Sequence, residues 1–214
     1  TKFQAQFLKN MFINLNILLQ KKIDRMASKY VDHTDVFLSM SGTGLNTGKK
    51  IREKNKIYIC ERASAHILEQ EKILMEEYKI LNLPPLKIDK RSIKREMDEY
   101  SESDIILVPS LFVKSSFKNH LPNLNKVYVL NFGINLQNFY PTQTTEKSSD
   151  YFDILFIGNL SIQKGLHYLI KAFNQFKHPK KRLHLVGGQN IRDYDFFKNK
   201  LKDENILLYG TVPH

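Results

Sequence analysis

The sequence predicts an α/β protein built from two parallel-sheet domains. Short apolar runs rich in strand-forming residues alternate with segments of helical spacing along most of the chain. This alternation stops at the polar segment 141–150, PTQTTEKSSD, and starts again after it. We therefore expect a first domain at 1–140, a linker at 141–150 and a second domain at 151–214. Right-handed crossovers should place helices on both faces of each sheet.

Composition narrows the class of protein and of partner. The chain has 214 residues, 42% of them hydrophobic, which is enough for one large domain or two modest ones. The chain has one cysteine, Cys60, so an intrachain disulfide and a cysteine-cluster zinc site are excluded. A single thiol fits a protein of a reducing compartment, and we expect Cys60 to be buried. No run approaches the ~18 apolar residues of a membrane span. The net charge of +11 is spread over both halves and favours an anionic partner: a nucleotide-sugar, an anionic lipid surface or a nucleic acid.

The apolar spacing predicts the elements of each domain. In the first domain we expect helices at 3–26, 67–82, 91–101 and 111–119 and strands at 35–40, 56–60, 104–109 and 127–131. In the second we expect strands at 153–157, 183–186 and 206–209 and helices at 165–176 and 192–201. Helix 3–26 is basic and amphipathic, as membrane-surface helices are, but we favour packing within its own domain. The charges of helix 91–101 should form a solvated face.

A glycine-rich stretch, 41–50, follows the first predicted strand and resembles a P-loop at first sight. With Gly48 and Lys49 as the Gly-Lys pair, the first glycine of the motif should stand at Thr43. The hydroxyl that would bind magnesium should stand at Lys50. Both positions fail, so the ATPase or kinase reading is rejected and a glycine-rich loop after a strand remains.

The stretch 152–165, FDILFIGNLSIQKG, is the strongest candidate for binding a phosphate. A predicted strand ends at Gly158, a polar loop follows, and Lys164 and Gly165 open a helix. Backbone N–H groups and the positive end of a helix attract anions, and here a lysine stands beside them. The alternative is an ordinary connection between a strand and a helix with a solvated lysine.

His66 follows the carboxyl end of the strand 56–60, where ligands of open parallel sheets gather. There it could donate a hydrogen bond to a sugar hydroxyl or a substrate carbonyl. The alternative, favoured on this segment alone, is a histidine that only caps the helix starting near Ala65.

Five short motifs follow one another along the chain: DIILVPS at 104–110 with Phe112, NFGIN at 131–135 with FYP at 139–141, FIGNL at 156–160 with Lys164 and Gly165, LVGG at 185–188, and LYG at 208–210. Taken in this order, they resemble the motifs of the group 1 glycosyltransferases, family four of the retaining enzymes with the GT-B fold. Each motif alone is weak, but the order, with the linker between the second and third, is specific and covers about residues 35–214. The Glu61–His66 segment also resembles the histidine-bearing loop of a bacterial subgroup.

The resemblance implies a GT-B fold of two Rossmann-like domains with the nucleotide-sugar held chiefly on the second. It implies that Lys164 holds the donor diphosphate and stabilises the leaving group without a metal or another cofactor. Gly158, Asn159 and Gly165 would complete this diphosphate site, although many members have arginine where this chain has Asn159. His66 would be the catalytic-site histidine that contacts the transferred sugar. The residues expected near the domain junction or the donor are Gly133, Asn135, Gly187 and Gly188.

The expected function is therefore sugar transfer from a nucleotide-sugar to a glycan or lipid-linked acceptor, in polysaccharide or lipopolysaccharide synthesis. We expect a cytoplasmic protein with peripheral contact to the inner face of the membrane, and no nucleic-acid partner. By the family's pattern, paired glutamates should follow residue 214 and a glycine-rich acceptor loop should precede Thr1. Both domains would then be incomplete, and the 214 residues alone are expected to be inactive. The alternative function is a non-catalytic nucleotide- or polyanion-binding α/β protein, which the net charge and Asn159 favour.

Overall fold

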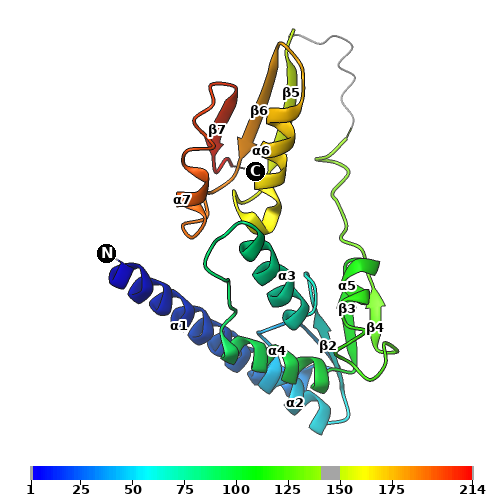
Figure 1. Ribbon diagram of the computed structural model, residues 1–214. Coiled ribbons are helices and arrows are strands. Elements are labelled where there is room, and N and C mark those ends of the chain that lie inside the picture. The colour runs from blue at the N-terminus through cyan, green and yellow to red at the C-terminus, as the bar shows by residue number, and fades with distance from the viewer. Residues whose placement is uncertain (1, 141–149, 214) are drawn as a thin grey trace. The chain divides into compact units, whose positions relative to one another are not determined.

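A computed structural model describes residues 2–140 and 150–213, with side chains from residue 11 onward. Its contacts divide the chain into two units, Thr1–Asn135 and Leu136–His214 (Figure 1). Each unit contains a parallel sheet connected through helices, so the predicted α/β class with two parallel sheets is confirmed. Residues 141–149 of the predicted linker lie outside the described residues.

Unit 1 is built on a four-stranded parallel sheet in the order β1-β2-β3-β4. The strands are β1 (Val36–Met40), β2 (Ile57–Glu61), β3 (Ile105–Val108) and β4 (Val127–Val129). The helices are α1 (Lys2–Ala27), the 3-10 helix η1 (Ser28–His33), α2 (Leu45–Glu53), α3 (Ile67–Ile80), α4 (Lys90–Glu102) and α5 (Leu111–Ser115). Helix α2 is not among the predicted helices, because its glycine-rich start is typical of a loop.

The core of unit 1 lies on one face of this sheet. Tyr58, Cys60, Ile106 and Val127 alternate with exposed or half-buried positions. They pack with buried residues of the helices, among them Phe117. The burial of Cys60 is as predicted. The opposite face carries exposed side chains in the described residues: Val36, Leu38, Met40 and Ile57. The expected cover of helices on both faces is therefore not found in this part of the chain.

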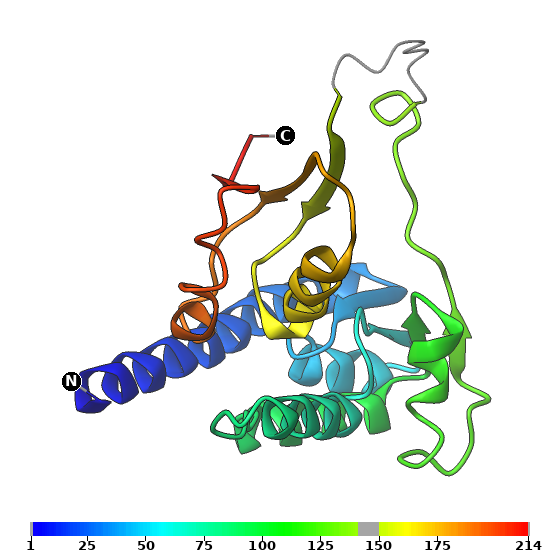
Figure 2. The ribbon, with the colours of Figure 1, turned by 45° about the horizontal axis from the view of Figure 1, so that its top comes forward.

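Helix α1 departs from the packing expected of it. In both views its N-terminal half extends beyond the rest of unit 1 (Figures 1 and 2). From residue 11 onward it buries only Ile17 and Asp24, and seven large apolar side chains are exposed: Met11, Phe12, Leu15, Leu18, Leu19, Ile23 and Met26. The prediction that its apolar face packs into its own domain is wrong for these residues.

Helix α4 was expected to carry only solvated charges, and this is also wrong. Glu99 has no exposed surface, and Glu96 is buried beside it. Both face the loops that follow β1 and β2, as described below. The exposed charges of α4, such as Lys94 and Asp98, form the solvated ion pairs expected of a surface helix.

Unit 2 has a three-stranded parallel sheet in the order β5-β6-β7. Its elements are β5 (Phe152–Ile157), the 3-10 helix η2 (Ile162–Lys164), α6 (Leu166–Gln175), β6 (Lys181–Val186), α7 (Tyr194–Phe197) and β7 (Ile206–Gly210). Helix α6 lies along β5 and β6 (Figure 1), and its buried residues include Leu166, Ile170 and Phe173. Leu155 and Ile157, which alternate with the inward residues of β5, are exposed. Helix α7 is shorter than the predicted helix 192–201.

Candidate functional site

In unit 2 the loops that leave β5 and β6 run side by side and support each other. The N–H of Gly158 donates to Val186 O at 2.9 Å, and the N–H of Leu160 donates to Gly188 O at 2.9 Å. The buried carboxylate of Asp193 accepts the N–H of Ile162 at 2.9 Å and so fixes the start of η2. Both loops lie at the carboxyl end of the sheet, where ligands of open α/β sheets bind.

Gly187 is required by this close approach of the two loops. Its φ is +138°, and a Cβ there would lie 2.0 Å from the carbonyl oxygen of Gly158. Neighbouring Gly188 is different, because its Cβ would meet Thr211 Oγ1 at 3.6 Å and Asn159 Oδ1 at 3.9 Å, which are ordinary contacts. Gly158, Asn159, Gly187 and Gly188, four of the predicted residues, thus lie together.

Lys164 and Gly165 lie at the start of α6, as predicted. Gly165 has φ +71° and is the N-cap of α6, with no side chain capping the helix and no acidic residue in its first turn. Lys164 is exposed and pairs with no carboxylate of the described residues. The positive end of a helix and a lysine therefore stand together here without a neutralising acid.

In unit 1 the glycine-rich loop after β1 has its backbone donors occupied by the protein's own carboxylates. Glu99 of α4 accepts the N–H of Gly42 through Oε2 and that of Gly44 through Oε1, the latter at 2.9 Å. Asp24 of α1 accepts the N–H groups of Asn46 and Thr47, both at 2.9 Å, at the start of α2. The carboxylates of Glu99 and Asp24 thus accept the backbone N–H groups that would bind a phosphate in a P-loop. This independently supports rejecting the ATPase or kinase interpretation.

The loop after β2 is held by a second buried pair. Arg62 donates to Glu96 Oε2 at 2.6 Å and to the carbonyl of Ala65 at 3.0 Å. It also donates to Ser41 Oγ at 3.2 Å, which joins this loop to the loop after β1. Tyr100 donates its hydroxyl to Glu96 at 2.7 Å.

His66 is the N-cap of α3, and its ring has no exposed surface. Its Nδ1 accepts the N–H of Leu68 at 3.4 Å, so the capping role named as the alternative is observed. Burial, with smaller contributions from His120 and Arg62, lowers the pKa of His66 to about 3. The ring is therefore neutral with its hydrogen on Nε2, and that buried atom has no partner among the described residues.

Aromatic rings surround His66. The ring of His120 stacks on it with centroids 4.2 Å apart, and Phe117 and Tyr100 contact it at 4.8 and 5.0 Å. Contact between Nε2 and a substrate would require these rings to open.

Gly133 and Asn135 lie in an exposed segment that leads out of unit 1. Gly133 has no positive φ, and no atom lies within 4 Å of the position of a Cβ. The conformation of this segment therefore does not by itself require glycine.

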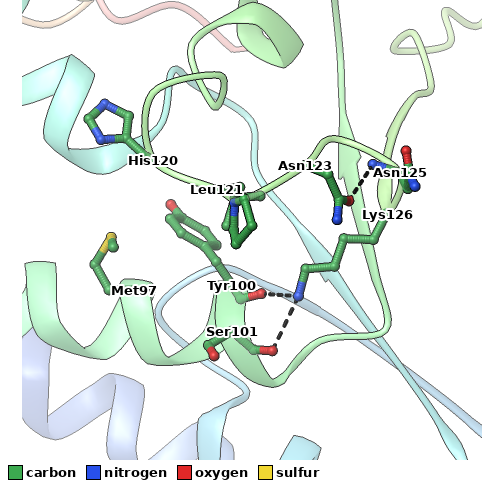
Figure 3. A pocket seen from close by; sticks show the side chains of 9 residues that line it. Met97, Tyr100, Ser101, His120, Leu121, Asn123, Asn125 and Lys126 are labelled. Atoms are coloured by element: carbon green, nitrogen blue, oxygen red, sulfur yellow. Dashed lines mark hydrogen bonds between the residues drawn. The ribbon is translucent and has the colours of Figure 1, made fainter.

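A cavity of about 540 Å³ lies between the C-terminal half of α4 and the segment that precedes β4 (Figure 3). Lys126 lines it and donates to the carbonyls of Tyr100 at 2.5 Å, Ser101 at 3.2 Å and Ser103 at 2.9 Å. Burial lowers the pKa of Lys126. Ser101 and Lys126 lie where the chain enters β3 and β4, so this side of the cavity is at the amino ends of the strands. The ammonium group of Lys126 is bonded to the three carbonyls and is not free to bind an anion in the cavity.

Sequence reasoning missed the residues that shape the unit 1 loops, namely Asp24, Arg62, Arg95, Glu96 and Glu99. One signal was present, because Glu96 lies three residues after Ile93 and four before Tyr100, on the face that those side chains bury. Within the described residues, no three histidine, cysteine or acidic side chains gather as metal ligands would. No helix of this part of the chain is long and apolar enough to cross a membrane.

Residues 142–214 match the family described as glycosyl transferases group 1, and they carry the loops of unit 2 described above. A comparison with curated proteins found no match.

Two solved proteins resemble the fold. The crystal structure of HepE from Anabaena in complex with UDP and glucose has a TM-score of 0.61 at 13% identity, over 88% of this chain and 52% of that one. HepE in complex with UDP-glucose gives 0.62 at 12% identity, over 89% and 52%. The apo form of the lipopolysaccharide outer core galactosyltransferase WaaB gives 0.51 at 13% identity, over 99% and 51%. The chain thus spans about half the length of these structures.

Proposed function

We propose that the protein is a retaining, metal-independent glycosyltransferase that moves a sugar from a nucleotide-sugar to a glycan or lipid-linked acceptor. The observation that carries the proposal is the match of residues 142–214 to the group 1 glycosyl transferases, which includes Lys164 at the start of α6. HepE, similar in fold, was solved with UDP-glucose, and WaaB is described as a galactosyltransferase of the lipopolysaccharide outer core. We place the activity in the cytoplasm, at the inner face of the membrane.

The chemistry assigns a role to Lys164. Breaking the bond between the sugar and the nucleotide leaves a diphosphate that gains negative charge. A preorganised donor to such a charge typically contributes ~3–4 kcal/mol, whereas a helix end contributes about 0.3–2 kcal/mol. Asn159 is neutral where many members of the family have arginine, so Lys164 would bear most of the cationic stabilisation. The backbone around Gly158, Gly165, Gly187 and Gly188 would border the diphosphate.

His66 would donate from Nε2 to the transferred sugar, because the neutral ring already uses Nδ1 to cap α3. Gly133 and Asn135 would lie near the donor at the junction of the two units. Retention would follow from attack by the acceptor hydroxyl on the face that the leaving group departs from, without a protein nucleophile.

The test is turnover of radiolabelled UDP-sugars by the full-length protein, with the anomeric configuration of the product read by NMR. We expect transfer or slow hydrolysis with retention, and Lys164→Ala should lower the rate about 10²–10³-fold. Lys171→Ala, an exposed lysine of α6, is the matched control and should leave the rate unchanged. Equal rates for Lys164→Ala and the wild type would refute the assigned role.

The second candidate is a non-catalytic nucleotide- or polyanion-binding protein, favoured by the net charge of +11. Titrations with UDP, GDP and a DNA duplex at two salt concentrations distinguish the two functions. DNA binding that weakens steeply with salt, together with no saturation by either nucleotide, would support this second candidate.

Peripheral membrane contact is proposed from α1, whose exposed apolar side chains lie beside Lys21, Lys22 and Arg25. Cations next to an apolar face suit an anionic lipid surface. Co-sedimentation with vesicles that contain phosphatidylglycerol should exceed that with phosphatidylcholine vesicles. Equal binding to both would count against the electrostatic part of this contact.

A further inference from the structure

The loop 41–44 leaves the carboxyl end of β1 and is held from beneath by one buried side chain, Glu99. The two oxygens of this carboxylate accept two different backbone N–H groups, those of Gly42 and Gly44. Arg95 adds a third hold, because its Nε donates to the carbonyl of Gly42 at 2.6 Å. Both ends of the turn are therefore bonded to α4.

The glycines allow this arrangement. Gly42 has φ +92°, which other residues rarely adopt, and a Cβ on Gly44 would lie 1.9 Å from Ser39 Oγ. Both backbone N–H groups are thereby turned towards Glu99 and not towards a ligand. A loop that has the glycine content of an anion-binding loop is thus closed by an anion from its own fold.

We propose that Glu99 is a positioning residue for the glycosyl transfer proposed above: its carboxylate, in place of a bound anion, fixes the loop 41–44 in the conformation that the reaction uses. The catalytic part of this inference rests on the proposed function, whereas the hold of Glu99 on the loop does not.

The charged groups packed around Glu99 influence whether its carboxyl group is ionised. Three buried acids, Asp24, Glu96 and Glu99, are held by two guanidinium groups. Arg95 donates to Asp24 at 2.6 Å and lies 3.6 Å from Glu99, and Arg62 bonds Glu96. The other titratable groups that face Glu99 are those of β2, Tyr58 and Cys60.

The burial of Glu99 is less fully compensated by hydrogen bonds than the burial of Asp24. Burial raises its pKa to about 7, against the opposing hydrogen bonds from Gly42 and Gly44. Asp24 behaves differently: burial would raise its pKa, but the hydrogen bonds from Asn46, Thr47 and Arg95 bring it below the usual value.

Protonation of Glu99 would release part of the loop. A carboxylate accepts both N–H groups, whereas a carboxylic acid places a hydrogen on one oxygen, which then faces a donor. Glutamine at this position has the same mismatch at every pH. Glu99→Gln should therefore reproduce the protonated state without a change of size.

The experiment is hydrogen exchange of the backbone amides of the full chain, resolved by NMR, at several pH values between about 6 and 8. When the loop opens locally, Glu99 stays buried on α4, so ionisation favours the closed loop even though it disfavours the fold as a whole. Protection factors, corrected for the intrinsic rates, should therefore rise through neutral pH at Gly42 and Gly44 in the wild type. In Glu99→Gln they should be about 10- to 100-fold lower and independent of pH. Asp98→Asn, a half-exposed acid of the same helix, is the matched control and should behave as the wild type.

Turnover by the full-length protein supplies the second readout. Loss of order in the loop 41–44 should lower kcat with little effect on KM. A plot of kcat against pH should change near neutral pH in the wild type and should not change there in Glu99→Gln. Equal protection at Gly42 and Gly44 in the wild type and Glu99→Gln would overturn the inference. The inference would also be overturned if Glu99→Gln changed the protection of Gly42 and Gly44 but left kcat and its pH dependence unchanged. If the wild type shows no turnover, the proposed function and the catalytic part fall together, and exchange alone decides the hold on the loop.

Discussion

At the scale of single residues, the buried groups His66 and Glu99 of unit 1 make the stability of the fold depend on pH in opposite directions. Burial lowers the pKa of His66 to about 3 and raises that of Glu99 to about 7. Ionised Glu99 is disfavoured in the fold, so its contribution to stability is full below the ordinary glutamate pKa and is lost as the pH rises through about 7. Charged His66 is disfavoured, so its contribution is present above the ordinary histidine pKa and is lost as the pH falls towards 3.

This gives a prediction for His66. His66→Gln should remove the acid-dependent loss of stability that the buried ring causes, which amounts to at most about 1.4 kcal/mol per pH unit below pH ~6.5. Urea unfolding of the wild type and the variant at pH ~5 and pH ~7.5 measures the difference. His33→Gln, at an exposed histidine, is the control. A pH dependence shared by the wild type and His66→Gln would show that the neutral, caged ring is not the cause.

The candidate residues divide clearly into those that the sequence could indicate and those that it could not. Lys164, Gly165 and the pair Gly187 and Gly188 stand in recognisable local motifs, where a strand ends and a turn begins. Glu99 acts across a separation of more than fifty residues, and its partners are backbone N–H groups, which no sequence pattern records. The many charged residues of helix 91–101 predict a solvated face. The number of charges does not show which of these side chains are buried, as Glu96 and Glu99 are.

At the scale of elements, the alternation of apolar runs predicted all seven strands, because buried parallel strands leave a strong local signal. The α-helix that the sequence does not predict is α2. It starts at a glycine N-cap without a side-chain cap, and the missing capping group is supplied by Asp24 from α1. A cap that comes from a distant helix cannot be seen in the local sequence.

Unit 2 offers a sharp test of the packing of its loops. Gly187→Ala would force a methyl group to 2.0 Å from Gly158 O at a φ of +138°, so it should destabilise unit 2 by about 1–3 kcal/mol or more. Gly188→Ala should cost less than about 1 kcal/mol, because its added carbon would meet only ordinary contacts. Thermal unfolding of the two variants provides the comparison. Equal melting temperatures would contradict the close approach of the loops after β5 and β6.

At the scale of the whole molecule, two parallel-sheet units, an excess of positive charge and a family match over residues 142–214 are the features from which we propose an anionic donor. The sequence predicted the two-sheet class but not the exposed apolar face of α1 or the uncovered face of the first sheet. Apolar periodicity reports that a face is apolar, and it does not report what covers that face.

We propose that unit 2 binds the diphosphate of a nucleotide through Lys164, and calorimetric titration with UDP is the direct test. UDP should bind saturably and more strongly than uridine, because uridine lacks the diphosphate. Lys164→Ala should lower the affinity for UDP about 10- to 100-fold, whereas Lys171→Ala should not change it. Binding of UDP and uridine with equal affinity, or an unchanged affinity in Lys164→Ala, would contradict it.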